Sequence, residues 1–230
     1  MIKKIFRWFA GIGLIALALL IGLATYTNVD NSITSDDISV FNKSFGLWQQ
    51  VKPSDYSNEI ALIRTLQAKG FALAPLGEGI PNNQPREPVD LIRAAQGLCY
   101  DRSRTFDKLL TYAGFETRHV FILYKKDTSF FRTLTQRGSN SHAATEVKTS
   151  RGWLLVDSNS PWIAVTREGY PVDAKNVSKH LTEFDDVPPQ LLQPYWAIRG
   201  MYSRTGELYP PYIPFPDFNW KDFTRALFYE

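Results

Sequence analysis

The chain has 230 residues, of which 44% are hydrophobic, which is enough for one domain with a substantial core and short for two. Its 26 Lys and Arg residues outnumber the 23 Asp and Glu residues, but three of the cations precede residue 8, and without them the two counts are equal. A neutral domain lacks the basic face that nucleic acid requires, so we expect no nucleic-acid partner. The single cysteine, Cys99, excludes an internal disulfide and is either a small buried residue or a reactive thiol.

Residues 1–27 have the pattern of a membrane-spanning helix. Residues 8–25 carry no charge, and at a rise of about 1.5 Å per residue they just reach across a hydrocarbon core of about 30 Å. The cations ahead of them predict a cytoplasmic N-terminus, so we expect a single-pass signal anchor with the rest of the chain outside the cytoplasm, in the periplasm or at the cell surface. The alternative is a cleaved signal peptide that uses the small residues Gly22 and Ala24, but an h-region is normally shorter, at about 7–15 residues.

Residues 28–54 are polar and rich in Asn, Asp and Ser, which predicts a linker or an extended arm. We expect its large apolar side chains to dock on the domain surface. They are Phe41, Phe45, Leu47 and Trp48.

Residues 55–187 form the predicted core domain, which begins with a helix. Asp55 or Ser57 is a suitable N-cap, apolar residues follow at helical spacing, and Gly70 is expected to end the helix. A loop rich in Pro, Gly and Asn covers residues 77–88.

The next stretch predicts a helix that starts at Cys99. A short helix over residues 89–95 leads to a turn at Gln96-Gly97, and apolar residues at three- and four-residue spacing then continue to a C-cap glycine at Gly114. Strands are expected at residues 117–124, 142–147 and 153–157, with a short turn over 149–152 between the last two. After Asp157, further strand and loop are expected over residues 163–187.

Cys99 is the candidate nucleophile. A free thiol has a pKa near about 8.5, and the start of a helix favours the thiolate because unpaired N–H groups and the helix dipole stabilise an anion there. Gly97 lets the chain turn sharply and leaves room for a substrate backbone, and the N–H of Cys99 is placed to face an oxyanion.

The predicted hairpin supplies a base and an acid. If the turn comprises residues 148–151, His142 lies opposite Asp157; if it comprises only 150–151, Asp157 lies opposite Ala144, diagonal to His142 and on the same face. Cross-strand Cβ distances are then about 5 Å directly or about 7 Å diagonally, so Asp157 can orient the His142 ring. A turn of three residues would place the two on opposite faces.

The other candidate polar residues receive no catalytic role. His119 is expected to be a half-exposed strand residue and His180 a surface helix residue. Gln96 is a possible oxyanion donor, although a loop-facing side chain is the simpler interpretation.

Residues 188–230 differ in composition from the core domain, with many aromatic residues from Tyr195 onward interleaved with prolines. One interpretation is a platform that stacks on sugar rings or extended peptides. We prefer the other, a C-terminal arm that wraps its own domain with aromatic side chains held in grooves.

The central stretch, residues 96–159, resembles the transglutaminase-like superfamily of papain-type thiol enzymes. The family shows a cysteine followed by a leucine-rich helix, a glycine–aliphatic–x–x–arginine segment that enters a strand, a His-Ala-Trp-x-Glu-Val motif and a Gly-Trp-x-x-x-Asp-Pro-Thr motif. The matching segments here are Gly97-Leu98-Cys99-Tyr100-Asp101, residues 109–118, His142-Ala143-Ala144-Thr145-Glu146-Val147 and Gly152-Trp153-Leu154-Leu155-Val156-Asp157.

The resemblance implies an α+β fold with a papain/transglutaminase-like core and Cys99, His142 and Asp157 as the catalytic triad. The sequence departs from the family at Ala144, where the family has Trp, and at Ser158-Asn159, where it has Pro-Thr. Both changes alter the expected substrate groove and count against protein cross-linking.

The function expected from these features is acyl transfer at an amide bond by a membrane-anchored, extracytoplasmic thiol enzyme without a cofactor or metal. With water as second substrate it is a cysteine peptidase or amidase, and with an amine it is a transglutaminase-type acyltransferase; the expected substrate is a peptide or amide, such as a cell-envelope component. Two alternatives remain. One is a non-catalytic binding or scaffolding domain for an envelope glycan or protein, and the other is a zinc site formed by Cys99, His142 and Asp157, although no close-spaced ligand pair supports zinc.

Overall fold

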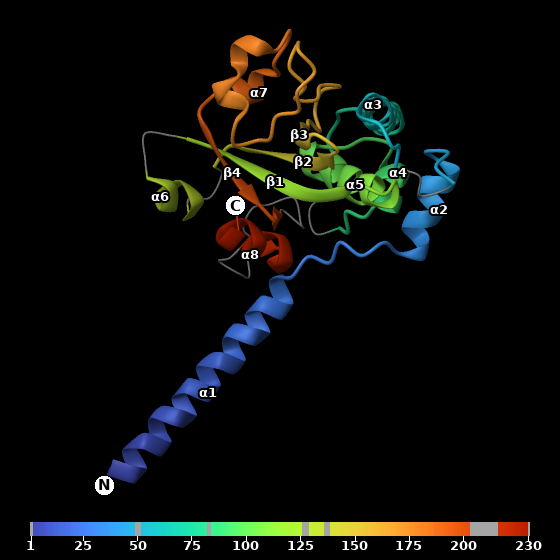
Figure 1. Cartoon of the computed structure of the whole chain (residues 1–230). Coiled ribbons are helices and arrows are strands. Elements are labelled where there is room, and N and C mark those ends of the chain that lie inside the picture. Colours follow the sequence, from blue (N-terminus) through green and yellow to red (C-terminus); the bar gives the residue numbers. More distant parts are fainter. Residues whose placement is uncertain are drawn as a thin grey trace.

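A four-stranded antiparallel sheet forms the centre of the computed structural model (Figure 1), in which residues 2–48, 52–81, 84–125, 129–135, 139–202 and 216–229 are described. The strand order is β3-β2-β1-β4. The bounds are β1 Glu116–Tyr124, β2 Ser141–Thr149, β3 Gly152–Val156 and β4 Tyr195–Arg199. Together with the helices this arrangement confirms the predicted α+β class.

Helix α5 (Cys99–Tyr112) packs against β1 and β2, and α3 (Tyr56–Leu73) packs against α5. The short helix α4 (Pro88–Ala94) precedes α5 and contacts it. Buried side chains of α5 such as Phe106 and Leu109 join those of the sheet in one hydrophobic core. Gly114 follows α5 with a φ of 96°, as expected of a C-cap glycine.

The predicted start of α3 is confirmed and its predicted end is wrong. The Asp55 side chain accepts a hydrogen bond from the Asn58 N–H at 3.0 Å and caps the helix. The helix runs through Gly70 because this glycine lies against α5. A Cβ at Gly70 would be 2.3 Å from Phe106 Cε1, so the residue permits two helices to approach closely rather than ending one.

The predicted arm contains a helix, α2 (Ser35–Lys43), so an extended conformation is wrong for these residues. Thr34 and Asp37 form a capping box at its start. Phe41 and Phe45 lie in the main core rather than on its surface, because α2 contacts α5 and Phe45 follows in the turn after this helix. Trp48, in contrast, is 68% exposed.

The predicted C-terminal arm packs on its own domain, as the preferred interpretation stated. Its strand β4 extends the main sheet beside β1. Two short strands, β5 (Met201–Tyr202) and β6 (Asp217–Phe218), pair with each other, and α8 (Trp220–Tyr229) follows. The aromatic residues Tyr209, Tyr212 and Phe215 lie outside the described residues.

The remaining elements are short and connect the larger ones. They are α6 (Phe130–Thr135), α7 (Pro189–Leu192) and the 3₁₀ helices η1 (Val177–Lys179) and η2 (Leu181–Glu183). Isolated bridges join Val156 to Ile163 and Val165 to Pro171, so residues 163–187 are mainly loop. The boundaries between the predicted domains stay a prediction.

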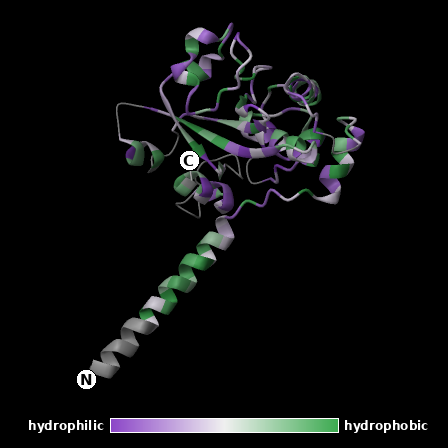
Figure 2. Ribbon diagram, viewed as in Figure 1, coloured by the Kyte–Doolittle hydropathy of each residue, from purple (hydrophilic) through white to green (hydrophobic). Residues whose placement is uncertain are grey.

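Helix α1 (Ile2–Thr27) extends away from the domain (Figure 1), and its described side chains are largely hydrophobic (Figure 2). The indole N–H of Trp220 donates a hydrogen bond to the Ala24 carbonyl at 2.9 Å, which holds the end of α1 against α8. In the part of the chain that the structure describes, no helix combines the length and the hydropathy required to cross a membrane. The predicted membrane-spanning helix stays a prediction.

Candidate active site

Cys99 is the first residue of α5, and the turn before it depends on Gly97. A Cβ at Gly97 would be 2.6 Å from Leu91 Cδ1, so the chain passes too close to α4 for any side chain here. This space was expected to admit a substrate backbone, but Leu91 fills it. The glycine therefore positions the start of α5 against α4.

His142 and Asp157 come together across the β2–β3 hairpin. Thr149 pairs with Gly152 and Thr145 with Val156, so the turn is the two-residue one. Continuing that register places Asp157 opposite Ala144 and diagonal to His142, which confirms the shorter of the two predicted turns. His142 Nε2 lies 2.5 Å from Asp157 Oδ1, and both side chains are buried.

The Cys99 thiol and the His142 ring lie close enough to shift each other's pKa. Since Nε2 of the ring is used by Asp157, Nδ1 is the nitrogen available to the sulfur. The backbone N–H groups of Tyr100 and Ala143 also favour the thiolate. The structure thus brings the three predicted site residues together, with His142 between Cys99 and Asp157.

The pKa shifts of Cys99 and His142 favour a thiolate beside an imidazolium. Burial alone would raise the pKa of the Cys99 thiol, but the hydrogen bond and charge of His142 and the two N–H groups outweigh it and lower the pKa. Burial alone would likewise lower the pKa of His142, but the bonds to Asp157 and Cys99 raise it to about 9. Such an ion pair is the reactive form of a cysteine nucleophile.

The second oxygen of Asp157, Oδ2, is held by four donors from the loop after β3 and from α7. Ser160 donates from Oγ at 2.6 Å and from its N–H at 2.8 Å, Asn159 donates from its N–H at 3.2 Å, and Gln190 Nε2 lies at 2.9 Å. Burial would raise the pKa of Asp157, but His142 and Ser160 lower it. Of the two residues that depart from the family pattern, Asn159 therefore helps to hold the carboxylate through its N–H, and Gln190 is a contact that sequence reasoning missed.

Arg102 joins the first turn of α5 to the loop after Asp157. It is fully buried; its Nε donates to the Ser158 carbonyl at 2.6 Å and its Nη2 to Asn159 Oδ1 at 2.7 Å. The guanidinium also lies over the Phe71 ring, 5.1 Å from its centre. Sequence reasoning missed this residue, and its place three positions after Cys99 was the available signal.

Glu146 and Arg118, two residues of the matching segments, form a buried ion pair away from the triad. Arg199 Nε donates to the same Glu146 oxygen at 3.0 Å, and the Ala174 N–H donates to the other at 2.6 Å. Burial would raise the pKa of Glu146, but the two guanidinium groups lower it. The cluster links β1, β2 and β4, so its role is structural.

The other residues considered in the sequence lie outside the triad. His119 is wrongly predicted as half-exposed, because it is 1% exposed and stacks on Tyr202 with ring centres 4.0 Å apart. His180 lies at the surface between η1 and η2 and contacts Glu183 at 2.8 Å. The Gln96 side chain lies against Gly77, which favours the loop interpretation over an oxyanion donor. Across the described ranges, no three His, Cys, Asp or Glu side chains are grouped to hold a metal ion.

Comparison with known proteins supports the resemblance. Residues 71–158 match the model of the transglutaminase-like superfamily, a range that starts before α4 and ends one residue after Asp157. A search of curated proteins finds no match. The resemblance stated for residues 96–159 is confirmed and extends toward the N-terminus into the last turn of α3.

Proposed function

We propose, from the premise that residues 71–158 form a transglutaminase-like domain, that the protein is a thiol enzyme that transfers or hydrolyses the acyl group of an amide. One observation carries the proposal: Cys99, His142 and Asp157 lie together, with His142 Nε2 2.5 Å from Asp157 Oδ1, the pKa of the thiol lowered and that of the imidazole raised. A half-buried cysteine without a chemical role has no use for a protonated partner, and burial around the pair opposes both charges.

The proposed reaction begins when the Cys99 thiolate attacks the carbonyl carbon of the amide. The negative charge passes to the carbonyl oxygen, which the N–H of Cys99 at the start of α5 stabilises. The His142 imidazolium then donates its proton to the nitrogen that leaves, and a thioester to Cys99 remains. Asp157 holds the ring in place and stabilises its charged form throughout.

The second half of the reaction depends on what attacks the thioester. His142, now neutral, takes a proton from water or from an amine as that group attacks, and the thiolate is released. Water yields a carboxylic acid, as in a cysteine peptidase or amidase, and an amine yields a new amide, as in a transglutaminase. We propose a peptide or amide of the cell envelope as the acyl donor, on the ground of the proposed location.

The proposed location is outside the cytoplasm, with attachment to a membrane through residues 8–25. The uncharged run and the cations before it support this, as do the exposed apolar side chains of α1, among them Leu14, Leu19 and Leu20 at 64–69% exposure. Membrane fractionation of cells that express the full chain tests it. Carbonate-resistant membrane association is expected, and recovery in the soluble fraction contradicts it.

The activity is tested by an electrophilic acyl probe applied to the full chain and to Cys99→Ala, with His180→Ala as a control at a surface histidine. Wild type and the control are expected to be labelled once, at Cys99, and Cys99→Ala not at all while its thermal unfolding stays the same. Screening of envelope peptides with product mass as the readout then separates hydrolysis from transfer. Equal turnover by Cys99→Ala contradicts the proposal.

A further inference from the structure

A small polar cavity of about 40 Å³ lies beside the first turns of α5. Its wall is formed by Tyr100 and Arg104 of α5, His119 of β1, Tyr202 of β5, and Val29, Arg86 and Glu87. A water molecule needs about 10–15 Å³ of such space. The cavity therefore has room for two or three atoms the size of a water oxygen.

His119 lines this cavity with a buried imidazole ring that lacks hydrogen-bond partners. The side chain is 1% exposed, and neither ring nitrogen has a hydrogen-bond partner among the described residues. Burial, with smaller effects of the Arg104 and His142 charges, lowers its pKa to about 3, so the ring is neutral and offers one donor and one acceptor. A buried polar group without partners requires an explanation, because nearly all such groups in native proteins are paired.

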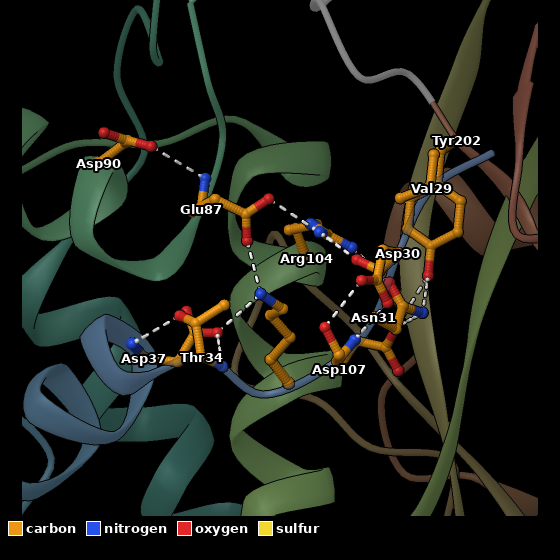
Figure 3. A network of polar contacts seen from close by, with 12 residues as sticks. Val29, Asp30, Asn31, Thr34, Asp37, Glu87, Asp90, Arg104, Asp107 and Tyr202 are labelled. Atoms are coloured by element: carbon orange, nitrogen blue, oxygen red, sulfur yellow. Dashed lines mark hydrogen bonds and ion pairs between the residues drawn. The ribbon is translucent and has the colours of Figure 1, made fainter. Parts of the chain in front are cut away.

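The charged groups of the wall are already paired, Arg104 with Glu87 among them (Figure 3). Arg104 donates to Glu87 Oε1 at 2.8 Å, to the Asp30 carbonyl at 2.7 Å and to the Asn31 side chain. Glu87 also accepts from Lys108 at 2.6 Å. Arg86, the second cation of the wall, is paired with Asp101 at 2.9 Å. An ion in the cavity would therefore face charges that are already paired, so the wall suits an uncharged group.

The chain after α1 closes the cavity on the side of Val29. Asn31 holds this segment in place because its amide donates to Tyr202 Oη at 2.6 Å and to Asp107 Oδ2 at 3.0 Å (Figure 3). Tyr202 Oη donates in turn to Asp107 at 2.8 Å. The hydroxyl of Tyr202, whose ring stacks on His119, therefore already has hydrogen-bond partners. The imidazole of His119 is left as the group without one.

The cavity lies beside the turn of α5 that carries the nucleophile. Tyr100, one of the residues of its wall, follows Cys99 directly. Of the residues in the wall, only Glu87 and Tyr100 are half-buried, and the others are buried. A molecule bound at Cys99 thus lies next to a residue of this wall.

We propose that this cavity receives a small uncharged group with both a donor and an acceptor, a hydroxyl or a primary amide, carried by the acyl donor next to the bond that Cys99 attacks. His119 is the residue that recognises it, with its N–H toward the oxygen of the group and its bare nitrogen toward the hydrogen. The inference rests on the proposed function, since the group belongs to the molecule that reacts with Cys99.

The test uses the full chain in detergent and peptidyl vinyl sulfones, on which the Cys99 sulfur forms a bond to the alkene carbon β to the sulfone while the carbon that bears the sulfone takes a proton. Matched probes carry Ser or Ala, and Asn or Leu, at each of the two residues before the electrophile. The measured quantity is the ratio of labelling rate constants within a pair. In wild type and in the control His180→Phe, the polar member of one pair is expected to react about tenfold faster.

In His119→Phe, which keeps an aromatic ring against Tyr202 and removes both nitrogens, the ratio is expected to fall to about one. His119→Gln, which restores a donor and an acceptor, is expected to recover part of it. His119→Met is a second variant without nitrogen partners, in case Phe prevents folding. A small alkylating reagent reports separately whether each variant keeps the Cys99 thiolate, and thermal unfolding reports whether it is folded.

The outcomes separate the inference from the function on which it rests. A ratio near one in wild type, or an undiminished ratio in His119→Phe, means that the cavity holds water only and overturns the inference alone. Absence of Cys99 labelling by every probe overturns the proposed function together with the inference.

Discussion

Two buried carboxylates of the sheet region, Asp157 and Glu146, have similar surroundings and opposite uses. Neither is exposed, and cationic partners lower the pKa of both despite burial. Glu146 faces two guanidinium groups, which stay protonated at any pH that a protein meets. Asp157 faces an imidazole, which can gain and lose a proton and which is joined to a thiol.

The partner, rather than the carboxylate, therefore decides whether a buried charge can take part in proton transfer. A guanidinium links the strands and keeps its proton. An imidazole can exchange a proton with a neighbouring group, so the carboxylate that stabilises its charged form also affects the protonation of that group. The comparison predicts that Asp157 variants lose activity more than stability and that Glu146 variants do the reverse.

The largest expected effect is that of Asp157→Asn on reaction with the acyl probe. The amide keeps the shape of the side chain but favours the wrong ring tautomer and gives no charge to hold the imidazolium, so the labelling rate at Cys99 should fall about 10³- to 10⁴-fold. Stopped-flow or mass-based labelling kinetics measure it. A loss of less than tenfold would mean that Asp157 does not orient His142 in the reaction.

Glu146→Gln is expected to cost stability, on the order of 3–5 kcal/mol, because it leaves Arg118 and Arg199 buried without a counter-charge. Chemical denaturation measures the free energy of unfolding. The labelling rate of the fraction that remains folded is the control, and it should stay far above that of Asp157→Asn. A stable Glu146→Gln protein with a lost labelling rate would reverse the comparison.

The two carboxylate sites should also differ in how their stability depends on pH. The raised pKa of His142 means that its contribution is fully present below its ordinary value of 6.5 and is lost as the pH rises through about 9. The difference in unfolding free energy between wild type and His142→Gln should thus shrink, by an amount on the order of 2 kcal/mol, between pH 6 and pH 10.

The corresponding difference for Glu146→Gln should stay constant over that range, because neither Glu146 nor its arginine partners titrate there. Denaturation curves of the three proteins at matched ionic strength supply the data. A parallel pH dependence of both differences would show that the loss arises elsewhere in the fold.

The smallest expected effect is that of Arg199→Lys, about 1 kcal/mol of stability. The charge beside Glu146 persists and Arg118 remains, but one ammonium cannot make the two contacts of a guanidinium, at 3.0 and 3.3 Å from the Glu146 oxygens. Thermal unfolding measures the change. A loss as large as that of Glu146→Gln would show that Arg118 alone does not neutralise the carboxylate.

The elements near the site were predictable because each depends on neighbours in the sequence. The helix that starts at Cys99 follows from apolar spacing, and its end at Gly114 follows from the need for a residue that tolerates positive φ. His142 and Asp157 lie on the same face of the hairpin because side chains alternate along each strand. A turn with an even number of residues was therefore enough to bring them together.

The supports of the site were not predictable in the same way. Arg102 and Gln190 reach the loop around Asp157 from distant segments, and no local pattern states which loop a buried guanidinium or amide will meet. Gly70 illustrates the same limit, because a glycine within a helical pattern signals an end unless another helix lies against it. His119 is a further case, since only the packing of Tyr202 over its ring shows that it is buried.

The amino-acid sequence by itself determined the class of fold, the start of the helix at Cys99 and the face on which a base and an acid stand, because these depend on periodicity, capping and turn length over short distances. Only the tertiary structure decided which groups surround them: the helix within the predicted arm, the fourth strand beside β1, the second oxygen of Asp157 and the cavity at His119. Contacts between distant segments depend on the shapes and charges that meet after folding, and a one-dimensional pattern does not contain them.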